Sequence, residues 1–166
     1  MAFVSNEYPF KSDLASKVRF PGSLISLIII GPLSDKYRNQ KKLLVTIGSI
    51  GRAIALIIIY FAITIRSLEL FIGAIFFQGF IVMFFWKPLD VLISERSSNE
   101  YRTKAFAIRT YMIGIGSLVG TLMAFGIIGI SNHFFPQNNW LLYCPLVIFA
   151  LFNIFSGIKF YIDVND

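Results

Sequence analysis

The sequence predicts an all-α protein, a polytopic bundle of transmembrane helices, on three observations. Apolar residues make up 56% of the 166 residues, whereas a soluble domain has about 45–50%. Charged residues make up 14%, against about 25% in soluble domains. The apolar residues are gathered in long runs separated by short polar loops. Because these runs are continuous and lack an alternation of period two, they indicate membrane helices and not barrel strands.

The apolar runs define a transmembrane helical domain at 20–162, between a polar N-terminal segment at 1–19 and a short tail at 163–166. They cover about 20–33, 43–65, 68–93, 105–130 and 140–162. A helix needs roughly 20 residues to cross a hydrocarbon core of ~30 Å, and the last four runs reach that length. The first run covers only about 21 Å. Two alternatives stay open for it: a start near Leu14, or a partial span.

The basic residues predict the orientation of the chain. They concentrate in two loops, 34–42 with Lys36, Arg38, Lys41 and Lys42, and 94–104 with Arg96, Arg102 and Lys104. The opposite loops carry only Arg66. Because Lys and Arg mark cytoplasmic loops, we expect a multi-pass protein of the cell membrane with 34–42 and 94–104 in the cytoplasm and 131–139 outside. The N-terminal segment, with three basic residues of its own, would then lie outside, against the same tendency.

Small residues predict where helices touch. Gly116, Gly120 and Ala124 recur every four residues in the fourth run, and Gly51 and Ala55 repeat this spacing in the second. Such a stripe lets another backbone approach closely.

The residue inventory argues against an enzyme and against a metal or cofactor. Cys144 is the single cysteine and lies in an apolar run, so we expect it to be an inert packing residue. His133 is the single histidine, so no Cys or His pair has the spacing of a metal site. The sequence also lacks paired Asp residues in a Gly-rich context. We read the net charge of +6 as membrane orientation and expect no nucleic acid partner.

The most specific local pattern ends the first run in a basic turn. It consists of Gly31, Pro32, Leu33, Ser34, Asp35 and Lys36. This pattern resembles the signature loop between the second and third helices of major facilitator superfamily transporters, Gly-x-Leu-Ala/Ser-Asp-Arg/Lys-x-Gly-Arg-Arg/Lys. The second half departs from it, with Arg38 in place of the glycine and Asn39 in place of an arginine. A chance basic loop is the alternative interpretation.

A second pattern supports the same resemblance. Pro88, Glu95 and Arg102 are similar to the loop between the fourth and fifth helices of that superfamily, especially in its sugar-porter branch. Gln78 and Gly79 are similar to its Arg-x-x-Gln-Gly pattern, but Ile75 stands at the Arg position, which puts the proton coupling linked to that Arg in doubt. The Gly-Pro-x-x-Gly-Gly hallmark of antiporters is absent from the fifth helix.

The resemblance covers about 20–162 and implies that the runs are helices two to six of a partial N-terminal half. It implies transport of a small solute, secondary active or facilitative, by a fragment or half-transporter that pairs with a second half or with another copy in the lipid bilayer. The N-terminal segment would then be the outer loop between helices one and two. The alternative is a non-transporting membrane subunit, or a regulatory or degenerate transporter fragment.

Charged residues inside the apolar runs are the remaining clue, because they are costly in lipid. Asp90 and Arg109 lie at similar depth on consecutive helices, so we expect them to pair. Arg52 lies about 15 Å along its helix from Lys42 and is expected to pair with a neighbour or a lipid headgroup.

The resemblance also implies that the fourth helix lines a cavity. Its polar residues then form a candidate substrate path, Gln78, Trp86, Lys87 and Asp90. A static salt bridge, with Lys87 reaching the interface, is the alternative. We also expect a cytoplasmic charge cluster in which Glu95 and Asp35 lie near Lys36, Arg38 and Arg102, each pair contributing about 0–1 kcal/mol.

Overall fold

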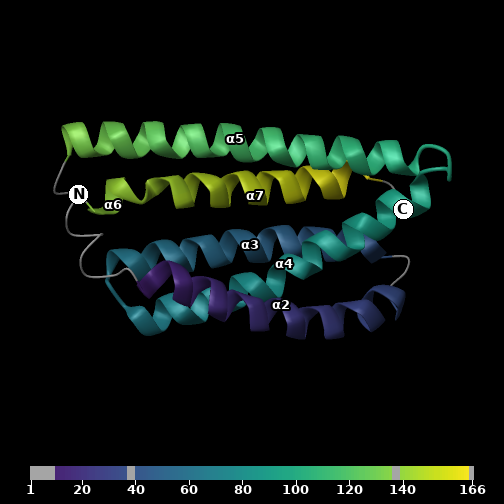
Figure 1. Cartoon of the computed structure of the whole chain (residues 1–166), viewed down its shortest axis with the longest axis horizontal. Coiled ribbons are helices and arrows are strands. Elements are labelled where there is room, and N and C mark those ends of the chain that lie inside the picture. The colour runs from purple at the N-terminus through teal and green to yellow at the C-terminus, as the bar shows by residue number, and fades with distance from the viewer. Residues whose placement is uncertain (1–9, 37–39, 136–138, 165–166) are drawn as a thin grey trace.

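The computed structural model describes residues 10–36, 40–135 and 139–164, and the elements in these ranges are helices (Figure 1). They are α2 (Phe10–Lys36), α3 (Lys41–Thr64), α4 (Leu68–Arg96), α5 (Arg102–Phe134), the short α6 (Asn139–Leu142) and α7 (Cys144–Asp163). Among the described residues, five helices are long and apolar enough to cross a membrane: Ala15–Leu33 of α2, and α3, α4, α5 and α7. The protein is therefore a polytopic helical membrane protein.

The first helix is longer than the sequence indicates. Helix α2 begins at Phe10, ten residues before the apolar run expected at 20, and its candidate span is Ala15–Leu33. Ala15 and Val18 pack against a buried cluster that includes Ile59 of α3 and Ala74 of α4. These contacts stabilise the part of α2 before residue 20, whose polar composition does not indicate a span. They favour a start of the first span near Leu14 over a partial span.

Helix α3 lies at the centre of the bundle. It packs against α4 on one side and α7 on the other, and α4 packs in turn against α2. In Figure 1, α4 runs obliquely from the side of α2 toward the end of α5. Polar contacts join α3 to α7: Ser49 Oγ donates to the Asn153 carbonyl at 2.6 Å, and Thr46 Oγ1 donates to the Gly157 carbonyl at 3.4 Å. Such interhelical hydrogen bonds replace the hydrophobic effect, which is weak between helices in lipid.

Glycines allow α4 to approach its two neighbours backbone to backbone. A Cβ atom at Gly48 of α3 would lie 2.7 Å from the Phe84 carbonyl carbon and from the Phe85 Cα. A Cβ atom at Gly22 of α2 would lie 2.5 Å from the Phe76 carbonyl oxygen. Because real Cβ atoms do not come so close, these two contacts fix how deeply α4 sits between α2 and α3.

Helix α5 stands apart from the other long helices. It touches α4, α6 and α7 only sparsely, and Ser131 is its one buried residue. Along the small-residue stripe, a Cβ atom at Gly120 would lie 3.7 Å from the Phe149 ring, whereas a Cβ atom at Gly116 would meet nothing within 4 Å. The expectation that another helix packs along the stripe is therefore wrong at Gly116 within this chain. In α3, by contrast, Gly51 and Ala55 are both buried.

Candidate functional site

Helix α4 carries an aromatic and an acidic side chain one turn apart. Trp86 and Asp90 are four residues apart, which places them on one face of the helix. Pro88 lies between them inside the helix and is buried. Because proline has no backbone N–H, the turn that holds Trp86 lacks one helical hydrogen bond. Trp86 and Asp90 therefore flank a position in α4 that donates no backbone hydrogen bond.

Asp90 forms an ion pair with Arg109 of α5. The Arg109 Nη2 and Asp90 Oδ1 atoms are 3.0 Å apart, and the two side chains are 22% and 34% exposed. This contact confirms the pairing expected from the depth of the two residues. Although the atoms are close, Asp90 Oδ1 and Arg109 Nε, both buried, have no hydrogen-bond partner among the described residues. The contact is therefore an ion pair in which Asp90 Oδ1 can still accept a hydrogen bond and Arg109 Nε can still donate one.

Trp86 lies within reach of two guanidinium groups from two different helices. The Arg109 Cζ atom is 4.7 Å from the centroid of the Trp86 ring, and the Arg52 Cζ atom is 5.8 Å from it. Arg52 also lies 5.2 Å from the ring centroid of Phe85. All three distances are in the range of cation–π interactions. We call Arg52, Trp86, Asp90 and Arg109 the arginine–tryptophan cluster; it joins α3, α4 and α5.

The cluster carries more positive than negative charge. It contains two arginines and one aspartate. Arg52 is half-buried, and its recorded contacts in the described part of the chain are with aromatic rings and not with a carboxylate. It lies about 16 Å along α3 from Lys41, near the middle of a hydrocarbon core of ~30 Å. An excess positive charge is therefore held deep in the membrane.

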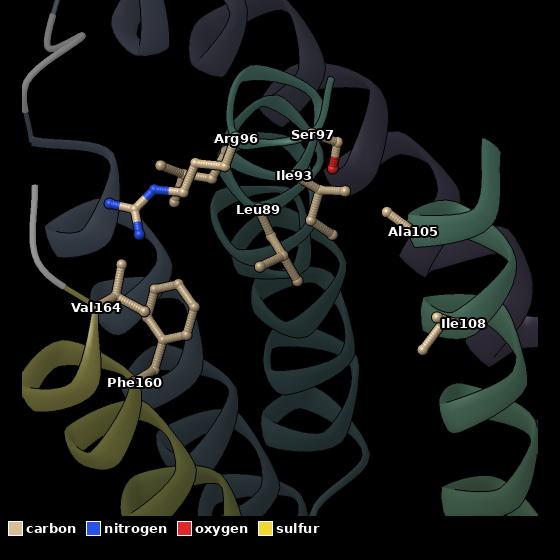
Figure 2. Close-up of a pocket in the computed structure, with 9 residues that line it drawn as sticks. Leu89, Ile93, Arg96, Ser97, Ala105, Ile108, Phe160 and Val164 are labelled. Atoms are coloured by element: carbon tan, nitrogen blue, oxygen red, sulfur yellow. The ribbon is translucent and has the colours of Figure 1, made fainter. Parts of the chain in front are cut away.

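An apolar hollow of about 410 Å³ lies between α4, α5 and α7. It is lined by Leu89 and Ile93 of α4, Ile108 of α5 and Phe160 of α7, with Arg96 at its edge (Figure 2). Leu89 and Ile108 directly precede Asp90 and Arg109 in the chain. Figure 2 shows α4 in the middle, with the α5 residues on one side and those of α7 on the other. The hollow therefore lies between the ends of α4 and α7 and the start of α5, and none of its lining residues belongs to the arginine–tryptophan cluster.

A second ion pair closes the end of the bundle where α3 begins and α4 ends. Lys41 Nζ donates to Glu95 Oε1 at 2.5 Å, and the two side chains are 4% and 40% exposed. Sequence reasoning missed Lys41 because it placed this residue in a solvated loop. We call this end of the bundle the Lys41–Glu95 end.

Other members of the expected charge cluster stay untested. Arg102 is exposed at the start of α5. Arg38 and the side chains of Ser34, Asp35 and Lys36 lie outside the described residues.

The remaining candidates do not join the arginine–tryptophan cluster. Gln78 is half-buried but lies two turns from Trp86, about 12 Å along α4. Lys87 is exposed. In the signature pattern, Leu33 is half-buried and a Cβ atom at Gly31 would meet nothing within 4 Å. Sequence reasoning also missed Phe85. An aromatic run in one membrane helix and an arginine in another are a signal that indicates a cation–π contact.

The described residues hold no group of three His, Cys, Asp or Glu side chains that could bind a metal ion. The His133 ring instead stacks edge-on against Phe134, with centroids 4.9 Å apart.

Comparison with known families gives one match. The family model described as Major Facilitator Superfamily matches residues 18–163, which is nearly the whole chain. No curated protein and no solved structure matches the chain.

Proposed function

Because the chain belongs to the major facilitator superfamily, whose members are membrane transporters, we propose that it moves a small solute by secondary or facilitated transport through the arginine–tryptophan cluster. The observation that carries this proposal is the convergence of charged side chains from three apolar helices, α3, α4 and α5. Ionisable side chains in transmembrane helices are expensive and usually mark a substrate or ion path. We propose that the solute reaches the pair from the side of the hollow, whose lining includes Leu89 and Ile108, the chain neighbours of Asp90 and Arg109.

We further propose that the cluster works between this chain and additional helices, supplied by a second copy or by a second transporter half. Transporters with internal repeats bind solute near the bilayer midplane and rock one repeat against the other. Helix α5 supports this, because it holds Arg109 yet has only one buried residue within this chain. The open space at Gly116 leaves room for the close approach of another backbone.

The orientation belongs to the same proposal. Basic residues concentrate at the Lys41–Glu95 end, where Lys42, Arg96, Arg102 and Lys104 also lie. We propose that this end faces the cytoplasm of a cell-membrane protein, because Lys and Arg are retained on that side. The hollow beside Arg96 would then be reached from the cytoplasm.

Transport is tested with the purified chain in proteoliposomes at increasing protein density, using a broad panel of radiolabelled solutes. We expect saturable uptake of one solute class in vesicles that hold several chains and none in vesicles that hold a single chain. Asp90→Asn should abolish that uptake while the helical circular dichroism is retained. Lys159→Gln, which removes a basic residue from an exposed site on α7, is the matched control and should not change it.

The outcomes separate the two parts of the proposal. Saturable uptake by single-chain vesicles would overturn the assembly and require a smaller transport mechanism. A folded chain that takes up no solute at any density would favour the alternative, a non-transporting membrane subunit or a regulatory one. Uptake that survives Asp90→Asn unchanged would place the solute path elsewhere.

A further inference from the structure

We infer that the solute is an anion, whose carboxylate or phosphate group binds Arg52 and Arg109 beside Trp86. This inference rests on the proposed function, because it names the substrate class of the same site. It goes further by giving a role to Arg52, which lies on the central helix and was expected to pair with a neighbour or a lipid headgroup. Three observations carry it: the charge balance of the cluster, its unused hydrogen-bond donors and the position of Asp90.

The charge balance comes first. The cluster holds Arg52 and Arg109 against the single carboxylate of Asp90. A buried charge is costly unless an opposite charge lies next to it. A bound anion would complete the pairing, a neutral solute would leave the excess in place, and a cation would increase it. The electrostatics of the site therefore favour an anionic solute.

The unused donors come second. Within the described ranges, Arg109 Nε is buried and has no hydrogen-bond partner, and Arg52 contacts the rings of Phe85 and Trp86. An aromatic ring attracts a guanidinium group but supplies no oxygen acceptor, so the N–H groups still need one. Guanidinium groups bind carboxylate and phosphate through paired N–H···O bonds. Both guanidinium groups lie against the same indole ring, and this is where we place the oxyanion.

Asp90 gives the site a way to release its ligand. Its Oδ1 atom lies 3.0 Å from Arg109 Nη2 but is not aligned for a hydrogen bond. An arriving oxyanion would compete with Asp90 for Arg109, and Asp90 would take its place again when the anion leaves. Asp90 thus acts as an internal competitor that keeps the empty site partly neutralised.

The test uses the fluorescence of Trp86. The chain has two tryptophans, so Trp140→Phe leaves Trp86 as the single indole and keeps an aromatic ring beside Tyr60. The full chain in nanodiscs of phosphatidylcholine is titrated with inorganic phosphate, succinate, glucose and choline. We expect a saturable change with phosphate or succinate and none with glucose or choline. Arg52→Gln and Arg109→Gln should each weaken the affinity by at least about tenfold, whereas Lys159→Gln should not change it.

Folding and lipid are controlled in parallel. Arg52→Lys retains the positive charge, so it should fold as the parent does and keep part of the affinity that Arg52→Gln loses. The titration is repeated in nanodiscs that contain phosphatidylglycerol, because a lipid phosphate offers the same chemistry as a free anion. Unchanged affinity supports a soluble anion. Loss of the response in phosphatidylglycerol would show that a lipid headgroup fills the site and would overturn the solute assignment.

Other outcomes also overturn the inference. They are a response to glucose or choline in place of the anions, equal anion affinity in the parent and in folded Arg52→Gln, and no response to any probe by the folded parent.

Failure of the inference is distinguishable from failure of the proposed function. Saturable vesicle uptake of a neutral solute without anion binding would retain the transporter and reject the anion. Anion binding without uptake at any protein density would retain the site and reject transport.

Discussion

In the Lys41–Glu95 pair, mutation of Glu95 should destabilise the protein more than mutation of Lys41. Lys41 is 4% exposed and Glu95 is 40% exposed, so removing the carboxylate leaves a buried ammonium without its partner, whereas removing the ammonium leaves a carboxylate that water can reach. Breaking a fully buried pair costs about 3–5 kcal/mol, and an exposed pair contributes about 0–1 kcal/mol. Since one partner is half in water, we expect Glu95→Ala to cost about 2 kcal/mol and Lys41→Met to cost less than about 1 kcal/mol.

The measurement is a double-mutant cycle on reversible unfolding by sodium dodecyl sulfate in mixed micelles, followed by far-ultraviolet circular dichroism. The double variant should recover most of the cost of Glu95→Ala, because it no longer holds an unpaired buried charge. Lys104→Met and Glu100→Ala, both at exposed positions, are the matched controls and should shift stability by less than about 0.5 kcal/mol. Equal costs for the two single variants, or no recovery in the double variant, would refute the reasoning.

Two further predictions address the packing and the orientation. Gly48→Ala should destabilise the bundle by about 1–3 kcal/mol in the same unfolding assay, because the new Cβ atom meets the backbone of α4. Gly73→Ala is the control and should be close to neutral, because a Cβ atom there meets nothing within 4 Å. Similar values for both variants would contradict the close approach of α3 and α4. For the orientation, a cysteine introduced at Asn99 in a Cys144→Ser background should resist an impermeant thiol reagent in intact cells and react after permeabilisation. Labelling from outside would reverse the proposed topology.

The two ion pairs show different limits of sequence reasoning. The Asp90–Arg109 contact could be predicted because both residues lie on long apolar helices, where depth follows from counting residues. The partner of Glu95 could not, because Lys41 lies at a helix start, and its burial depends on which neighbouring helices cover it. The same applies to Arg52: counting placed it deep in the membrane, but only the packing of α3 on α4 sets it against Phe85 and Trp86.

The sequence by itself determined the membrane class, the spanning helices and the superfamily resemblance. Exposing unpaired backbone N–H and C=O groups to lipid is costly, so a long apolar run crosses the membrane as a helix. It did not determine where α2 begins, which faces of the helices meet, or that α5 stays largely uncovered. These follow from tertiary packing: contacts of Ala15 and Val18 extend α2, and Gly48 and Gly22 set how closely α4 sits to its neighbours. In lipid, apolar side chains can face outward at no cost, so an apolar run predicts a helix but not its partner.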